Sequence, residues 1–410
     1  MENFQRNLEK YAELVVKVAL NIQKGQKLRI NAAYENADFV RMVTRKAYQA
    51  GAKKVYADLY DPMIQRITYE EAPEEGLADF PDWHVKMYDE LIDEGGALLE
   101  VAALDPDLLQ GVDPERVATA RKAAGSAMGR FRDAQTNGDI TWCILSVPTK
   151  KWAAKIFPDL EEDQQIDALW EQIFYTTRVD KENPVAEWEN HLQTLVEKAD
   201  FLNEKRFKTL HYKSPGTDLT IGLADDHLWA AAGFTTKKGI RFIPNVPTEE
   251  VFTMPHKDRI NGTVASTKPL NYGGDLIENF SLTFENGKVV DFQAEKGYDT
   301  LKSILDTDEG ARSLGEVALV PHDSPISNSE LIFFNTLFDE NASCHIALGN
   351  ALLLNIEDAE SQSKEKLAEK GFNESITHVD FMIGSADLDI DGETYDGEQV
   401  PVFRNGNWAF

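Results

Sequence analysis

Three consecutive segments decide the fold of the first part of this chain: QKLRINAA at residues 26–33, ENADFVRMVTRKAYQA at 35–50 and KKVYADLY at 53–60. The first and third have the length and apolar content of strands. The middle one has the apolar spacing of an amphipathic helix and ends at Gly51. A strand, a helix and a second strand joined by short connections indicate a parallel sheet.

The sequence on either side of this unit extends the same pattern. Before it, YAELVVKVALNIQ at residues 11–23 predicts an amphipathic helix that stops near Gly25. After it, GGALLEVAAL at 95–104 and DITWCILSV at 139–147 predict buried strands, with helices expected around 114–133 and 149–157. The first third of the chain is therefore predicted to be an open α/β layer fold.

A change of pattern near residue 205 indicates a second domain. Residues 161–205 are helical in spacing and contain no strand signal, whereas FSLTFENGKVVDFQAE at 280–295 alternates with period two around a predicted Asn286-Gly287 hairpin turn. Further turns are expected at Asp391-Gly392 and Asp396-Gly397. The predicted fold class is α/β: an N-terminal parallel-sheet domain over residues 1–205, followed by an α+β domain rich in antiparallel strands over 206–410.

Composition excludes several classes of partner. The chain has 410 residues, enough for two domains, and 42% of them are apolar, enough to form substantial cores. Its formal net charge of -28 would repel nucleic-acid phosphates and anionic membrane surfaces. No run of 18 apolar residues and no signal peptide is present, so we expect neither a nucleic-acid nor a membrane partner.

The two cysteines, Cys143 and Cys344, lie far apart in apolar sequence. This argues against a disulfide framework and favours a reducing compartment. We therefore expect the protein to be cytoplasmic.

THVDFMIGS at residues 377–385 contains the first candidate site. Successive side chains of a strand point to opposite faces, so His378 and Asp380 share one face while Val379 and Phe381 share the other. One imidazole nitrogen and one carboxylate are candidate metal ligands. The alternative is a hydrogen-bonded structural histidine.

FDENASCHIALGNAL at residues 338–352 contains the second candidate site. A capping box at Ser327 and Glu330 predicts a preceding helix, with an apolar face at Leu331, Phe334 and Leu337. Glu340 then falls at the helix C-terminus, where the helix dipole disfavours a carboxylate unless a cation lies nearby. Small neighbours of His345 allow close backbone approach. The alternative is an exposed glutamate and a core histidine.

Two further glutamates stand beside apolar runs. In RSLGEVALV, residues 312–320, Glu316 heads such a run, where a buried charge is costly unless it is paired or bound to metal. In PTEEVFTMPH, residues 247–256, Glu249 and Glu250 begin a short predicted strand. Either could instead be an ordinary charge on an edge strand.

DLDIDGETYDGE at residues 387–398 matches the spacing of an EF-hand calcium loop. An EF-hand requires helices on both sides, whereas the flanking segments HVDFMIG and VPVF have the pattern of strands. A hairpin is therefore the preferred interpretation.

Taken in order, EEVFTMPHKDRINGTV, SLGEVALV, NTLFDENASCHIALG and THVDFMIG resemble the metalloaminopeptidases of the aminopeptidase T, aminopeptidase S and PepS type, along the whole chain. The resemblance implies an N-terminal α/β domain, a C-terminal catalytic domain and a homodimer that acts on peptides with a free N-terminus. It also implies two divalent metal ions, such as zinc, cobalt, manganese or magnesium, with Glu316 bridging them. The implied ligands are Glu250, Glu316, Glu340, His345, His378 and Asp380.

Two features of the implied site stay open. A tyrosine commonly follows the ALG motif in that family, whereas this chain reads GNALLLNI. No separate general base is identified, although His256 and Asp258 follow Glu250 closely, and Lys257 or Arg259 could orient a substrate. The expected function is a metal-dependent aminopeptidase. The alternatives are a dinuclear hydrolase of another amide or ester, and a non-catalytic metal-binding protein of the same fold.

Overall fold

The computed structural model describes residues 3–102, 105–231, 233–272 and 274–410. Contacts group the chain into two compact units, one made of Met1–Asn190 with Gly233–Pro247 and the other of His191–Ala232 with Thr248–Phe410. The predicted domain boundary near residue 205 stays a prediction, because compact units defined by contacts do not show which parts fold separately. Among the described residues, no helix has both the length and the apolar character needed to cross a membrane.

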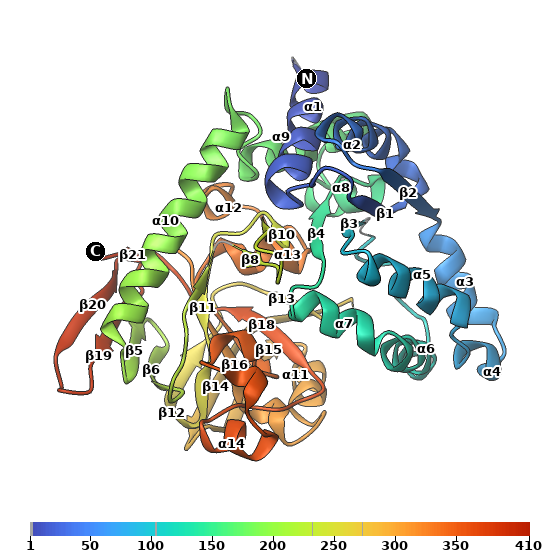
Figure 1. The fold of residues 1–410 in the computed structure, drawn as a ribbon. Coiled ribbons are helices and arrows are strands. Elements are labelled where there is room, and N and C mark those ends of the chain that lie inside the picture. Colours follow the sequence, from blue (N-terminus) through green and yellow to red (C-terminus); the bar gives the residue numbers. More distant parts are fainter. Residues whose placement is uncertain (1–2, 103–104, 232, 273) are drawn as a thin grey trace. The chain divides into compact units, whose positions relative to one another are not determined.

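The first unit is built on a parallel sheet with the strand order β10, β4, β3, β1, β2 (Figure 1). Each neighbouring pair is parallel, which confirms the predicted α/β layer fold. The predicted strand at 95–104 is β3, and its last two residues lie outside the described residues. The strands are β1 Lys27–Ala33, β2 Lys54–Tyr60, β3 Ala97–Ala102, β4 Thr141–Ser146 and β10 Asn245–Val246, beside a two-stranded ribbon of β8 Phe234–Thr235 and β9 Arg241–Phe242.

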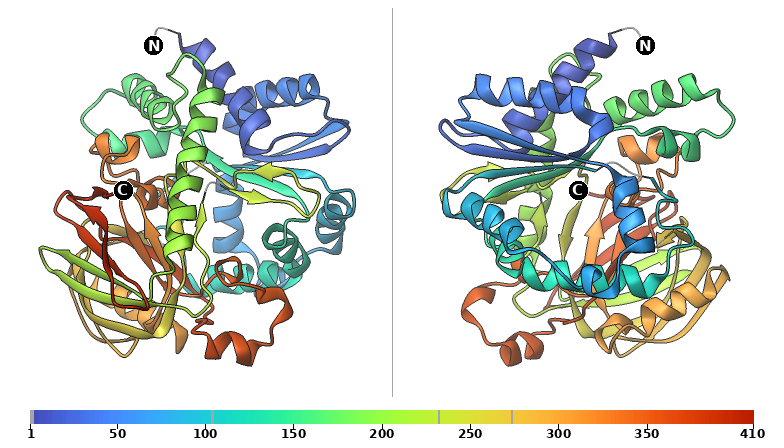
Figure 2. Two further views of the ribbon diagram at one scale, coloured as in Figure 1. Left: turned by 60° about the vertical axis from the view of Figure 1, so that its left-hand side comes forward. Right: turned by 90° about the vertical axis from the view of Figure 1, so that its right-hand side faces the viewer.

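Helices cover both faces of this sheet, with α1 and α2 on one face and α5 and α7 on the other (Figure 2). The segment predicted as one helix at 114–133 forms two helices, because the helical conformation is interrupted at Met128, between α6 and α7. The helices are α1 Phe4–Leu14 continued by the π-helical turn η1 Val15–Ala19, η2 Tyr34–Asn36, α2 Ala37–Ala50, α3 Pro62–Glu71, α4 Glu74–Leu77, α5 Asp82–Asp93, α6 Pro114–Ala127, α7 Gly129–Thr136, α8 Lys150–Ile156 and α9 Glu162–Thr176. Helix α10 Pro184–Lys205 begins in this unit and continues into the second.

The second unit contains two antiparallel sheets, which confirms the predicted α+β character of the second half. The larger sheet consists of β5 Thr209–Ser214, β6 Thr217–Leu223, β12 Pro255–Ala265, β13 Leu270–Tyr272, β14 Asp275–Glu285, β15 Lys288–Lys296, β19 Asp389–Glu393, β20 Gln399–Arg404 and β21 Asn407–Trp408. The smaller sheet has the order β18, β17, β16, β11, β7. Its strands are β7 Ala230–Ala231, β11 Val251–Thr253, β16 Leu314–Leu319, β17 His345–Gly349 and β18 His378–Met382.

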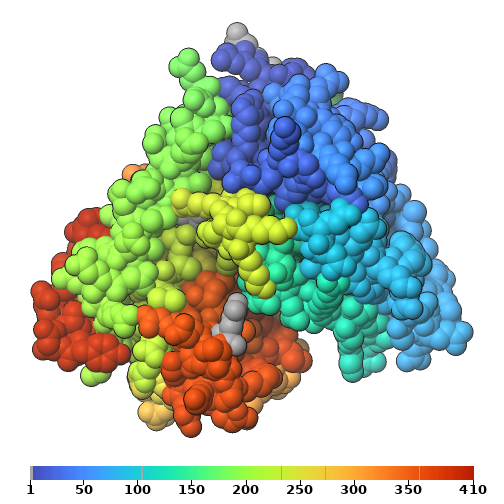
Figure 3. Space-filling model, viewed as in Figure 1, coloured from blue at the N-terminus to red at the C-terminus, as the bar shows by residue number. Residues whose placement is uncertain are grey.

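Short helices and the C-terminus complete the second unit. The ring of the C-terminal Phe410 stacks on Phe201 of α10, with ring centroids 3.7 Å apart. In Figure 3 the C-terminal strands (red) accordingly lie beside α10 (green). The remaining elements are α11 Tyr298–Leu305, η3 Gly310–Arg312, α12 Pro325–Asn328, α13 Thr336–Asp339, η4 Glu340–Ala342, η5 Leu353–Asn355, η6 Ala359–Ser361 and α14 Lys364–Glu369.

Two predicted hairpin turns are confirmed and one is wrong. Asn286 and Gly287, with φ of +48° and +84°, connect β14 to β15, and Gly397 lies in the turn between β19 and β20. Asp391 and Gly392 instead lie within β19. Gly392 is there because the Phe207 ring occupies the space that a side chain would need. Residues 387–398 thus form the first strand and the turn of a β-hairpin, which is the interpretation preferred above to a calcium loop.

The hairpin turn at Gly287 gives a stability prediction with a matched control. A Cβ at Gly287 would overlap the Lys257 carbonyl oxygen, whereas a Cβ at Gly397, with a similar φ of +88°, meets no heavy atom within 4 Å. Left-handed strain costs about 1–2 kcal/mol at either position, and overpacking adds about 1–3 kcal/mol at Gly287. Denaturant unfolding should therefore show that Gly287→Ala costs clearly more than Gly397→Ala. Equal losses would contradict the packing assigned to this turn.

Candidate metal centre

Five of the six predicted ligands lie in strands of the smaller sheet of the second unit or directly before one, and the sixth lies in a short helical turn. Glu250 directly precedes β11, Glu316 lies in β16, His345 begins β17, and His378 and Asp380 lie in β18. Glu340 follows the C-terminus of the short helix α13 and begins η4. Because β11, β16, β17 and β18 are consecutive in the sheet, residues far apart in the sequence meet on one face.

Strand register explains how the carboxylates approach one another. Glu316 is paired with Ala347, and Ala347 with Asp380, so these three side chains form a row on the same face. His378 is paired with Gly349. Strand β17 therefore presents an alanine between Glu316 and Asp380, which leaves room for these two larger side chains.

Glu316 faces both histidines, one with each carboxylate oxygen. Its Oε1 lies 3.7 Å from His345 Nε2, and its Oε2 lies 3.5 Å from His378 Nε2. His345 Nε2 is also 3.3 Å from Glu250 Oε2, and His378 Nε2 is 3.3 Å from Asp380 Oδ1. Two groups with metal-ligand spacing result, Glu250–Glu316–His345 and Glu316–His378–Asp380, and they share Glu316.

Both histidines are oriented by backbone carbonyls. The Nδ1 of His345 donates to Ser343 O at 3.2 Å, and the Nδ1 of His378 donates to Asn350 O at 2.7 Å. In the neutral imidazole this leaves Nε2 as the nitrogen with a free lone pair, directed toward the carboxylates. Such second-sphere hydrogen bonds are typical of histidines that ligate metals.

Burial and crowding shift the ionisation of this cluster. Burial, together with the nearby Asp380 and Glu250, raises the pKa of Glu340 well above its usual value. Burial likewise raises the pKa of Glu316, with Asp380 contributing. Burial would lower the pKa of His378, but Asp380 and Glu316 outweigh it and raise that pKa to about 10. Burial and mutual repulsion thus make it costly to charge these carboxylates together, a cost that a bound cation would offset.

A test of fit for divalent ions uses the buried oxygen of Asp380. Asp380 Oδ1 is buried and has no well-aligned hydrogen-bond donor among the described residues, although His378 Nε2 lies 3.3 Å away. Such an atom is costly unless a cation or water satisfies it. Carboxylate oxygens combined with imidazole nitrogens suit zinc, cobalt or manganese better than calcium. The residues present thus fit a divalent transition-metal site.

One prediction next to the site is wrong. The helix predicted from a capping box at Ser327 and Glu330 does not continue to Leu337, because the chain turns at Glu330 and Phe334, where φ is +56° and +51°. The buried carboxylate of Asp339 accepts the backbone N–H groups of Phe333 and Asn335 at 2.7 and 3.0 Å. These side-chain bonds replace helical ones.

The residues near Glu250 in sequence have other partners. Arg259 forms an ion pair with Asp225, at 2.8 Å between Nη1 and Oδ1, and His256 Nδ1 accepts the backbone N–H of Asp258 at 3.2 Å. Burial lowers the pKa of His256, with Arg259 contributing. These contacts give His256 and Arg259 structural roles in β12.

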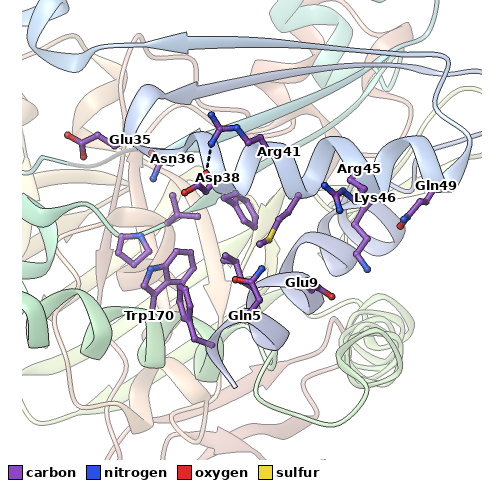
Figure 4. A pocket seen from close by; sticks show the side chains of 16 residues that line it. Gln5, Glu9, Glu35, Asn36, Asp38, Arg41, Arg45, Lys46, Gln49 and Trp170 are labelled. Carbon is purple, nitrogen blue, oxygen red and sulfur yellow. Dashed lines mark hydrogen bonds and ion pairs between the residues drawn. The ribbon is translucent and has the colours of Figure 1, made fainter. Parts of the chain in front are cut away.

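A groove of about 750 Å³ lies in the first unit, whereas all six predicted ligands lie in the second. Helices α1 and α2 and Trp170 of α9 form its walls (Figure 4). Acidic and basic side chains line it in equal number, namely Glu9, Glu35, Asp38, Arg41, Arg45 and Lys46. Its charges balance, so its lining does not single out a class of ligand.

Carboxylates and imidazoles gathered on one face of a sheet, with a shared glutamate, are characteristic of metal-dependent hydrolases. The chain belongs to the thermophilic metalloprotease (M29) family, whose model matches residues 4–408. It is an enzyme of this class, and the predicted family resemblance is confirmed.

Named relatives agree along the whole chain. Aminopeptidase 2 of Geobacillus stearothermophilus is 53% identical over 100% of this chain and 99% of its own length. Aminopeptidase T of Thermus thermophilus is 46% identical over 100% of both chains. A solved structure of wild-type AmpT from Thermus thermophilus superimposes with a TM-score of 0.93 at 45% identity, covering 99% of this chain and 100% of that one.

Proposed function

We propose that this chain is a metal-dependent aminopeptidase that removes N-terminal residues from peptides by means of two divalent ions. The observation that carries the proposal is the position of Glu316, whose two oxygens face different histidines, each of which has a carboxylate of its own. That arrangement supports two adjacent ion sites with one shared ligand. The aminopeptidase names of the full-length relatives support the substrate class.

In this proposal Glu250 and His345 would hold one ion, His378 and Asp380 would hold the other, and Glu316 would serve both. Glu340, whose pKa responds to both Asp380 and Glu250, completes the set. Four carboxylates contribute a charge of about -4, which two divalent ions neutralise. Ions bound there would supply Lewis-acid activation of water and of the scissile carbonyl.

The protein side chains supply position and charge. Ser343 O and Asn350 O fix the two imidazole rings, so Nε2 of each is held in place before an ion binds. The free α-amine of a peptide could serve as a ligand of one of the two ions. A substrate whose amine is acetylated loses that interaction, and this distinguishes an exopeptidase from a general amidase.

The test is a panel of aminoacyl p-nitroanilides, with and without N-acetylation, assayed on the metal-loaded protein. We expect the free-amine substrates to release nitroaniline and the acetylated ones to react at least about 10²-fold more slowly, the size of a lost positioning interaction. Equal hydrolysis of both sets would indicate a different amide hydrolase. Bound metal with no turnover on any member would indicate a non-catalytic protein.

We also propose that the enzyme acts as a cytoplasmic homodimer. Cys143 and Cys344 are buried free thiols, which supports a reducing compartment. Large apolar side chains exposed on β2, α3 and α5, among them Leu59, Ile64 and Trp83, support an interface in the first unit. Light scattering should give twice the mass of one chain, and cell fractionation should recover the protein with the cytosol.

A further inference from the structure

Asn341 is a fully buried polar residue between two of the predicted ligands. It lies in η4 directly after Glu340, and its relative exposure is 0%. Its Oδ1 accepts the backbone N–H of Glu249 at 2.8 Å, one residue before Glu250. Its Nδ2 donates to Leu337 O at 3.1 Å and lies 3.5 Å from Glu340 Oε1. One side chain therefore connects the segments that carry Glu250 and Glu340.

The segment before β11 is held from a second side by α10. His191 Nε2 donates to Thr248 O at 2.8 Å and lies 3.5 Å from the buried carboxylate of Glu249. Glu249 and Glu250 are consecutive, so when Glu249 points to His191, Glu250 points the other way, toward His345 Nε2. The peptide group that joins Thr248 to Glu249 is thus held from both sides, its carbonyl by His191 and its N–H by Asn341.

We propose that Asn341 is a positioning residue of the metal centre, which fixes the spacing between Glu250 and Glu340 and thereby the affinity of the ion that Glu250 and His345 hold. This inference rests on the metal site proposed above. It assigns no contact with substrate to Asn341. Its amide has the two functions required, because Oδ1 accepts from one ligand-bearing segment while Nδ2 donates to the other.

The proposal predicts an asymmetric loss of metal affinity. Removing a second-sphere partner of a metal ligand typically weakens metal binding about 10–100-fold. In Asn341→Ala the segment of Glu250 loses its link to η4, whereas the Nδ1 bond from His378 to Asn350 O and the pairing of β17 with β18 stay in place. The ion near His378 and Asp380 should therefore lose clearly less affinity, and only through Glu316, the ligand that both sites share.

The experiment is a cobalt titration of the metal-free protein, followed by the visible absorption of each bound ion. Asn203→Ala is the matched control, because Asn203 also accepts one backbone N–H and donates to one carbonyl, both of Trp229, at 2.8 and 2.9 Å. Wild type and Asn203→Ala should bind two ions alike. Asn341→Ala should show one binding step weakened about 10–100-fold and the other weakened much less, with an altered spectrum for the more weakened ion. Should Asn341→Ala not fold, Asn341→Ser, whose hydroxyl is too short for both bonds, carries the same expectation.

The outcomes separate this inference from the proposed function. Two unchanged binding steps in Asn341→Ala would overturn the positioning role, and so would equal weakening of both steps or an equal effect in Asn203→Ala. A wild-type protein that binds fewer than two ions would instead overturn the two-metal proposal, and the positioning role with it.

Discussion

Glu316→Gln is expected to reduce kcat/KM on a free-amine substrate by about 10³-fold or more, because a single preorganised electrostatic group is commonly worth about 10²–10³ and this one serves both ion sites. Glutamine keeps the size of the side chain but loses the charge that Oε1 and Oε2 share between His345 and His378. Elemental analysis should find the bound metal reduced from two ions per chain to one or none.

Asp391→Asn is the control for this substitution. It also removes one negative charge from the second unit, but Asp391 lies in β19 and pairs with Arg404 at the surface. Surface ion pairs contribute about 0–1 kcal/mol, so activity and metal content should stay near wild type. If Glu316→Gln kept two ions per chain and activity within tenfold of wild type, the assignment of Glu316 as a shared ligand would be wrong.

Local sequence patterns predicted the parts of the fold whose apolar residues face a core. Residues 27–60 form the predicted strand, helix and strand because the apolar positions of α2, such as Phe39, Val40 and Val43, are buried at helical spacing. Helices α3 and α5 were not predicted, since their large apolar residues, including Ile64 and Trp83, are exposed and follow no core-facing period. Strand β10 has only two residues, too few for any periodicity, and joins the parallel sheet from residues 245–246.

The candidate site was predictable to the level of its ionisable residues and no further. Carboxylates and histidines stand out against apolar strands, but the family resemblance, not the pattern, selects the set of six and prefers Glu250 to Glu249. The structure places five of them in two groups with metal-ligand spacing. Their support does not stand out in the same way. The carbonyls of Ser343 and Asn350, which orient the imidazoles, belong to the backbone and leave no mark in the sequence. In the sequence, Asn341 cannot be told from an ordinary loop residue, because its partner Glu249 lies 92 positions away.

The register of the smaller sheet limits the size of the side chains that face the ligands, and this limit can be inferred only from the strand pairing. Ala347 and Gly349 are unremarkable as residues of an apolar strand, yet each faces a ligand across the ladder, Glu316 and Asp380 for the first and His378 for the second. A larger side chain at Ala347 would separate Glu316 from Asp380. Pairing of distant strands therefore determines which small residues matter.

Complete removal of metal is expected to abolish activity, because all the proposed ligands serve the same ions. Zinc or cobalt should restore it, whereas calcium, which prefers oxygen ligands throughout, should not. The measurement is activity before and after exhaustive chelation, with metal content followed by elemental analysis. Full activity in a sample shown to contain no metal would end the metal hypothesis.

Chelation should also destabilise the fold. Without ions, Glu250, Glu316, Glu340 and Asp380 are crowded on one face of the sheet, and ions that bind only the folded chain add about 2.7 kcal/mol per site at a concentration of 100 times Kd. Melting curves should therefore show a large gap between wild type and Glu316→Gln when metal is present. The gap should shrink sharply in chelator, because neither protein then gains from binding. A gap of equal size in both conditions would mean that Glu316 stabilises the second unit as part of its core, and the cluster would then be a structural network of buried charges.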